Sequence, residues 1–191
     1  MSIKKLVSKP TSPKDLYLIA GGKFNIFRYS DINNFDKVDD LFEPGNSEIC
    51  ESINLDLPFN DSHIILLYNS EPSFGHWCSL SRNDYGYNFM DSYGGVVDDP
   101  LDFVDDDTNK ELGQEKKHLA KLLLDSNKDV YYNDFQLQKL SNDVATCGRY
   151  CAVYFRYNDL KIDDFVKGIK KLAKKLGIDY DTLIVYLSVI D

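Results

Sequence analysis

Three short motifs contain residue types that would together support thiol-dependent hydrolysis. A Gly-His-Trp motif contributes His76, an Asp-Ser-Tyr-Gly motif contributes Asp91, and a Thr-Cys-Gly motif contributes Cys147. A cysteine protease needs an imidazole base, a carboxylate that orients it, a thiol nucleophile and a donor to the developing oxyanion. Gln138, upstream of the thiol, is the candidate donor.

Cys147 begins a mainly apolar segment, 147–157, that is typical of a buried helix. A thiol at a helix N-terminus lies at the positive end of the macrodipole, which lowers its pKa and favours the thiolate. Gly148 would leave room for a substrate backbone, so we expect it to bind substrate. Cys151, one turn further on, is expected in the core. In isolation, Cys147 is more simply a small buried residue, so its assignment depends on the other motifs.

A predicted β-hairpin brings the base and the acid together. Asn83 and Asp84 tolerate the positive φ that a two-residue turn requires. That turn pairs His76 with Asp91, and directly opposed Cβ atoms lie about 4.5–5.5 Å apart. The carboxylate would then accept the imidazole N–H, fix its tautomer and favour the imidazolium. A bulge at Gly86 would shift the register by one residue and remove this pairing.

Two glutamines compete for the role of oxyanion donor. Gln138 precedes Cys147 by nine residues, and its amide could act together with the backbone N–H of Cys147. Gln136 also lies upstream of the thiol and stays the competing candidate.

Composition and charge exclude several classes of function. The 191-residue chain has 22 Lys and Arg against 31 Asp and Glu, a formal charge of −9, which disfavours nucleic acid and anionic membranes as primary ligands. No apolar run approaches the ~20 residues of a membrane span, and the N-terminus lacks a signal-peptide stretch, so an intracellular protein is expected. The four cysteines and three histidines show no usual metal-ligand spacing. We therefore expect no metal and no cofactor.

The apolar pattern predicts an α+β fold in one domain, because strands cluster early in the chain and helices late. The polar residues 1–14 are expected to form an N-terminal arm, and residues 15–191 the domain. Expected strands cover 24–29, 63–68, 75–82, 85–91 and 130–132, expected helices cover 33–42, 111–124, 147–157, 161–175 and 180–190, and 96–109 is an expected surface loop.

With these motifs in this order, the chain resembles the adenain-like cysteine proteases, in the clan of the SUMO-deconjugating proteases. The resemblance covers roughly residues 19–158 and is greatest to the maturation proteases of virophages, Polinton-type elements and large DNA viruses. It implies a mostly antiparallel central sheet packed on a buried central helix that carries the cysteine. By motif, the resemblance makes His76 the general base, Asp91 the orienting carboxylate and Cys147 the nucleophile. Gln138 would be the oxyanion donor, and Trp77 would be a substrate-binding aromatic residue near the imidazolium.

The resemblance also implies an activity and a setting. The protein would be an endopeptidase that cleaves a viral capsid or structural precursor during particle maturation, through an acyl-enzyme intermediate. It would act as a monomer in the host cytoplasm or viral factory, or be packaged in the virion. Two alternatives stay open: a protease that removes ubiquitin-like modifiers, and an inactive binding module with a protease fold.

The chain departs from the family pattern in one interval. The spacing from Gln138 to Cys147 is about two residues longer than in adenain, so either residues 139–145 bulge or Gln138 is not the residue that matches the family's donor. The adenovirus enzyme also uses a peptide and DNA as cofactors. The charge of −9 disfavours the DNA part here, and the peptide is not carried over.

Overall fold

Two long strands, β2 (Phe59–Glu71) and β3 (Phe74–Asn83), form a hairpin at the centre of the sheet in the computed structural model, which describes residues 2–189. Seven consecutive residues of β2 are buried. A strand with such a continuous apolar run must be covered on both of its faces. The sequence His63–Tyr68 therefore predicted the strand correctly, although the strand extends further at both ends.

The sheet has five strands in the order β1-β2-β3-β4-β5. The outer strands are β1 (Lys23–Arg28) and β5 (Val130–Tyr132), and β4 (Gly86–Met90) lies between β3 and β5. The two inner pairings are antiparallel, whereas β1 pairs with β2 and β5 pairs with β4 in parallel. The fold is thus α+β with a mixed sheet. The expected antiparallel arrangement holds only for the strands joined by tight turns, because β1 and β5 are connected through longer crossovers.

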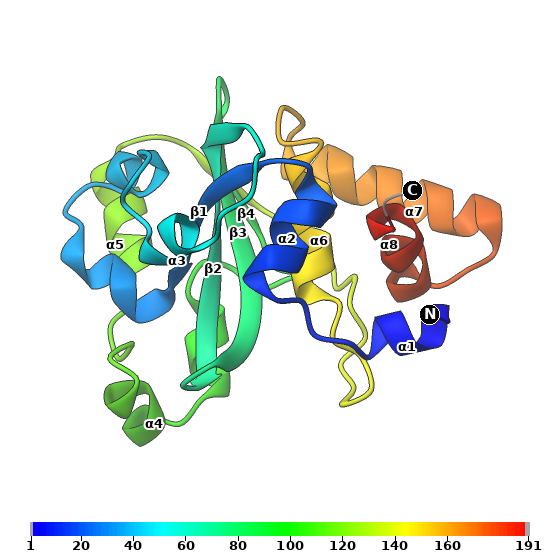
Figure 1. Ribbon diagram of the computed structural model, residues 1–191, viewed down its shortest axis with the longest axis horizontal. Helices are drawn as coiled ribbons and strands as arrows, with labels where there is room; N and C mark the ends of the chain where they lie inside the picture. The colour runs from blue at the N-terminus through cyan, green and yellow to red at the C-terminus, as the bar shows by residue number, and fades with distance from the viewer. Residues whose placement is uncertain (1, 190–191) are drawn as a thin grey trace.

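Helices cover both faces of the sheet (Figure 1). One core lies beneath α2, α6, α7 and α8, and a second core lies on the other face beneath α5 and three 3-10 helices. The bounds are α1 Ile3–Val7, α2 Pro13–Ala20, α3 Glu48–Ser52, α4 Asp106–Glu111, α5 His118–Asp125, α6 Cys147–Phe155, α7 Ile162–Leu176, α8 Tyr180–Ser188, and 3-10 helices Tyr29–Asn34, Val38–Phe42 and Asp99–Phe103.

Helix α6 is the most deeply buried helix near the motifs. All of its residues from Cys147 to Tyr154 are buried, which explains the apolar segment seen in the sequence. It packs against α2, β3 and α8. These three neighbours hold the helix in place and so restrict where its N-terminal residue can lie.

Several expected elements differ from the structure. Of the expected helix 111–124, only residues 118–124 form a helix of their own, within α5; residue 111 is the last of α4, and 112–117 are not helical, with Gly113 at φ +69. The expected loop 96–109 contains a 3-10 helix and most of α4, and the expected helix 33–42 consists of 3-10 turns. Residue 190, the end of the last expected helix, lies outside the described residues.

The N-terminal segment contains helix α1 and leads into α2. Ser12 and Asp15 form a capping box at the start of α2, with Pro13 at the first helical position. Thr11 is buried, and its carbonyl accepts a hydrogen bond from Nε1 of Trp77 at 3.2 Å. Within residues 2–189, no helix has the length and apolar character that a bilayer crossing needs.

Candidate active site

The hairpin forms, but its turn lies one residue further on than expected. Asn83 pairs with Gly86, and Oδ1 of Asn83 accepts the backbone N–H of Tyr85, so Asp84 and Tyr85 make the turn. The predicted pairing of residues 76 and 91 is therefore wrong by two positions. A shift of two keeps every side chain on its expected face, because side chains along a strand alternate with period two.

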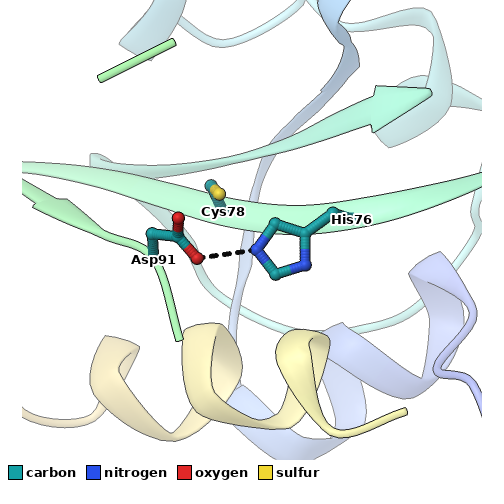
Figure 2. A group of neighbouring side chains, drawn as sticks. All are labelled: His76, Cys78 and Asp91. Atoms are coloured by element: carbon teal, nitrogen blue, oxygen red, sulfur yellow. Dashed lines mark hydrogen bonds and ion pairs between the residues drawn. The ribbon is translucent and has the colours of Figure 1, made fainter. Parts of the chain in front are cut away.

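His76 and Asp91 still meet, along the diagonal of the extended register. Nε2 of His76 lies 2.7 Å from Oδ1 of Asp91, and Figure 2 shows the ring and the carboxylate facing each other. Across a hairpin, such diagonal neighbours lie within reach of a long side chain. The contact that the sequence predicted is thus present with a different backbone pairing.

The Asp91 carboxylate is buried and held by the loop that follows it. Oδ1 also accepts the backbone N–H of Tyr93 at 2.8 Å, and Oδ2 accepts that of Gly95 at 3.2 Å. The Asn133 side chain bonds both the N–H and the carbonyl of Asp91, at 3.1 and 2.6 Å. These bonds fix the orientation of the Asp91 side chain toward His76.

Cys147 is the first residue of α6, and it lines the same cleft as His76, which lies close enough to affect the pKa of its thiol. Burial alone would raise the pKa of this thiol, but the hydrogen bond and charge of His76, aided by backbone groups of Trp77 and Gly148, lower it overall. Burial alone would lower the pKa of His76, but hydrogen bonds and charges from Asp91 and Cys147 raise it. Both directions favour a thiolate–imidazolium pair.

The aromatic ring stacked on the imidazole is Tyr93. The ring centroids of His76 and Tyr93 lie 4.6 Å apart with an interplanar angle of 20°. Trp77, the aromatic expected near the imidazolium, is buried with its indole N–H bonded to the Thr11 carbonyl, and it also lines the cleft that contains His76. Tyr93 belongs to the Asp-Ser-Tyr-Gly motif that contains Asp91. Its place in that motif could have indicated a position near His76, although its residue type alone did not.

Gln138 is buried in the wall beside Cys147. Its Oε1 accepts the Ser92 hydroxyl at 2.8 Å, while Nε2 donates to the Tyr93 hydroxyl at 3.1 Å and to the Val144 carbonyl at 3.3 Å. Both amide hydrogens are therefore engaged. A substrate oxyanion would have to replace one of these acceptors, and the longer bond, to Val144, is the weaker of the two.

Gln136, the competing candidate, points elsewhere. Its side chain is exposed and donates to the backbone carbonyl of Gln138 at 2.9 Å. It does not line the cleft that contains Cys147. The geometry therefore favours Gln138 as the amide donor.

Gly148 lies against the protein rather than the cleft. A Cβ atom at this position would approach Oγ1 of Thr11 to 2.0 Å, Cδ1 of Trp77 to 2.9 Å and Cδ2 of Leu16 to 3.0 Å. Glycine therefore allows α2 and the N-terminal segment to pack closely on α6. This packing is a structural role that differs from the expected substrate contact.

A cleft of about 920 Å³ runs past the thiol. Its volume suits several residues of an extended polypeptide. The candidate residues that line it include His76, Trp77, Gln138 and Cys147. Among residues 2–189, the charged residues that line it are Lys14 and Arg28 and none is Asp or Glu, although the chain has 31 acidic residues.

Three potential metal ligands also meet at this site. Ligand atoms of His76, Cys78 and Asp91 lie within 4.8 Å of one another (Figure 2). The 2.7 Å contact between His76 and Asp91 is a hydrogen bond, which occupies the two atoms that a metal would need. Burial raises the pKa of the Cys78 thiol, which keeps it protonated and a poor ligand. The arrangement fits a hydrogen-bonded pair beside a neutral thiol better than a metal centre.

Comparison with known proteins relates the chain to one from a virophage. It is 27% identical over 176 residues to the uncharacterized protein V9 of Sputnik virophage, and the match covers 92% of this chain and 91% of that protein. No family model matches the chain. The similarity supports a virophage-related origin, and it extends over nearly the whole length of both proteins.

Proposed function

We propose that the protein is a cysteine endopeptidase with Cys147 as its nucleophile. The observation that carries the proposal is the position of the His76 ring, hydrogen bonded to a buried carboxylate and lining the same cleft as a helix N-terminal thiol whose pKa it lowers. Since Nε2 is bonded to Asp91, Nδ1 is the nitrogen left for the sulfur. This is the relation that nucleophile, base and orienting acid require.

The reaction would proceed by acyl transfer to sulfur. The Cys147 thiolate attacks the scissile carbonyl carbon, and the negative charge moves to the carbonyl oxygen. The His76 imidazolium then gives its proton to the leaving amine as the C–N bond breaks, which leaves a thioester. Neutral His76 next accepts a proton from water, whose oxygen attacks the thioester, and Cys147 departs as a thiolate.

The oxyanion would be stabilised by the Gln138 amide and the backbone N–H of Cys147. Gln138 would first exchange its bond to Val144 for one to the substrate, while its bond to Tyr93 keeps the amide in place. Burial, with the charges of Cys147 and Asp91, raises the pKa of Tyr93 to about 12, so its hydroxyl stays protonated at neutral pH.

A viral structural precursor is the proposed substrate. The cleft is large enough for a polypeptide, and the chain is similar to a virophage protein. The described lining contains two cations and no acidic residue, so an acidic substrate side chain on either side of the cleavage site would meet no carboxylate that repels it. These observations favour a protein substrate over a nucleic acid, because two cations are few for phosphate recognition.

The test is cleavage of the virophage capsid precursor, followed by mass spectrometry of the intact products. Wild-type protein is expected to cut one bond and give two fragments, one with a new C-terminus and one with a new N-terminus, and Cys147→Ala to give none. A ubiquitin-like probe with a C-terminal electrophile is assayed in parallel. Labelling of that probe with no cleavage of the precursor would show a deconjugating protease instead, and no reaction with either would contradict the proposed activity.

A further inference from the structure

A buried carboxylate far along the chain ties together the two residues that flank the site. Oδ2 of Asp181, in the first turn of α8, accepts the backbone N–H of Lys139 at 2.9 Å, and Oδ1 accepts the hydroxyl of Thr146 at 2.5 Å. The Tyr150 hydroxyl, one turn into α6, lies 3.4 Å from the same Oδ1. Asp181 is only 5% exposed. We call the bonds from Lys139 and Thr146 the Asp181 clamp.

The clamp joins the two ends of one irregular segment. Lys139 follows Gln138 directly, and Thr146 precedes Cys147 directly. Residues 139–146 between them form neither helix nor strand, and a single backbone bond, from Val144 N–H to the Ser141 carbonyl at 3.1 Å, lies inside the segment. Two further bonds hold the segment, from Nε2 of Gln138 to the Val144 carbonyl at 3.3 Å and from the Ala145 N–H to the Val7 carbonyl at 2.8 Å. Neither fixes the Lys139 end of the segment, which Asp181 holds.

We propose that Asp181 is a positioning residue that sets the distance between the Gln138 amide and the Cys147 thiol. The inference rests on the proposed cysteine protease function. An oxyanion donor must lie about 2.7–3.1 Å from the place where the oxygen will carry its charge. With both ends of segment 139–146 bonded to one carboxylate, that distance is held without any contact between Asp181 and substrate.

A carboxylate suits this task better than a neutral group. Hydrogen bonds to an ionised acceptor are stronger than neutral ones, and both oxygens can accept at once. An asparagine at the same position is neutral, so its Oδ1 can accept only a weaker bond from the Lys139 N–H, and the Thr146 hydroxyl must turn to accept from Nδ2. Asp181→Asn therefore weakens both bonds of the clamp while it preserves the shape of the side chain.

The experiment compares three variants with the wild type. Asp181→Asn weakens the clamp from α8, and Thr146→Val removes one of its bonds from the opposite side. Asp179→Asn is the matched control, because Asp179 lies two residues away and its carboxylate bonds only Thr182, at 2.8 Å to both N–H and hydroxyl. Asparagine also keeps the capping role of that residue.

Three measurements separate positioning from mere folding. Precursor cleavage gives kcat and KM, alkylation of Cys147 by iodoacetamide reports the thiolate without any oxyanion, and hydrogen exchange at the Lys139 amide reports the clamp. For Asp181→Asn and Thr146→Val we expect kcat to fall by about 10-fold to 10²-fold. The upper end of this range equals the smallest effect expected when a whole oxyanion donor is removed. KM and the alkylation rate are expected to stay close to wild type, and the Lys139 amide of Asp181→Asn to exchange faster.

The outcomes are distinguishable. Unchanged kcat in Asp181→Asn despite faster exchange at Lys139 would overturn the positioning role and leave the protease function intact. A parallel fall of kcat and alkylation in both variants would also overturn it, because the thiolate pair itself would then have been lost. A wild type that cuts no protein substrate would refute the function and, with it, the positioning role, whatever the exchange at Lys139 shows.

Discussion

Nε2 of His76 and Oδ1 of Asp91 lie 2.7 Å apart, which commits one ring nitrogen to the acid and leaves the other for the Cys147 sulfur. Asp91 is buried and accepts two backbone N–H bonds besides, so its orientation is not free to follow the ring. The carboxylate thus sets the direction of the imidazole rather than the reverse. Most of the expected behaviour of the site follows from this arrangement.

The pH dependence of thiol reactivity should reveal the ion pair. The pKa of Cys147 is lowered and that of His76 is raised. The thiolate therefore forms at a pH below the usual thiol pKa, and the imidazolium persists at a pH above the usual histidine pKa. Iodoacetamide should therefore alkylate Cys147 well below pH ~8.5, the ordinary range for a free thiol. In His76→Ala the profile should move to higher pH, as followed by mass spectrometry. Identical profiles would exclude pairing of the two residues.

Asp91→Asn should reduce turnover while the protein stays folded. An amide can still accept a bond from the ring but cannot stabilise its positive charge, so the pKa of His76 should fall toward its usual value. We expect kcat to fall by about 10²-fold, the lower end of what acid–base catalysis contributes. Asp84→Asn, at the exposed turn of the same hairpin, is the control for charge removal. Equal kcat in the Asp91 variant and this control would mean that another group orients His76.

Gln138→Ala and Gln136→Ala should differ sharply. Gln138 lines the cleft with its amide beside Tyr93, whereas Gln136 is exposed and outside the cleft. Loss of an oxyanion donor costs about 10²–10³ in kcat, so that loss is expected for Gln138→Ala alone. Steady-state kinetics on the precursor would measure it. The opposite ranking would identify Gln136 as the donor.

Gly148→Ala should destabilise the fold rather than act on substrate binding. Its new methyl group would lie 2.0 Å from Oγ1 of Thr11, and overpacking of this kind costs about 1–3 kcal/mol of unfolding free energy. Gly168→Ala is the matched control, because that glycine lies within α7 with open space around it. The control should stabilise the protein by about 0.5–1 kcal/mol in urea unfolding. A stable Gly148→Ala with raised KM would restore the expected substrate role.

His63 should make the protein sensitive to acid. Its ring is fully buried among Phe24, Tyr154 and Phe155, and neither nitrogen has a hydrogen-bond partner within the described residues. Burial lowers the pKa of His63 to about 3. The unfolded state then binds more protons, so stability falls as pH drops from ~6.5 toward 3, by at most about 5 kcal/mol in total.

The substitution His63→Leu tests this linkage. The variant should lose much of the decline in unfolding free energy between pH ~6.5 and 3, because leucine cannot bind a proton. His118→Gln serves as the control, since His118 is only partly buried and bonds the Phe35 carbonyl at 3.0 Å. The measurement is urea unfolding at a series of pH values. A decline in His63→Leu as steep as in the wild type would place the acid sensitivity elsewhere.

The sequence predicted local features of the site better than relations between distant segments. The apolar run after Cys147 and the hairpin around Asp84 each depend on neighbouring residues, so helix α6 and the two strands were recognisable. The exact turn was not, because Asn83 could serve as a turn residue or, as observed, bond its side chain to Tyr85. The contact of His76 with Asp91 survived that error only because the shift was an even number of residues.

Other parts of the site had no readable signal. Asp181 occurs in an ordinary Asp-Tyr-Asp stretch at the start of a helix, and nothing in that pattern indicates bonds to Lys139 and Thr146. The stacking of Tyr93 on His76 likewise arises from tertiary structure. The parallel pairing of β1 with β2 depends on a crossover whose direction short-range patterns do not specify.

The placement of Asp181 has a consequence for when the molecule becomes competent. Thr146 and Asp181 are 35 residues apart, so the nucleophile emerges from the ribosome well before the carboxylate that braces its neighbours. A nascent chain that has emerged only to residue 160 contains thiol, imidazole and acid but lacks the carboxylate that bonds Lys139 and Thr146. Under the proposed role of Asp181, full turnover would begin only once α8 has left the ribosome and packed on α6.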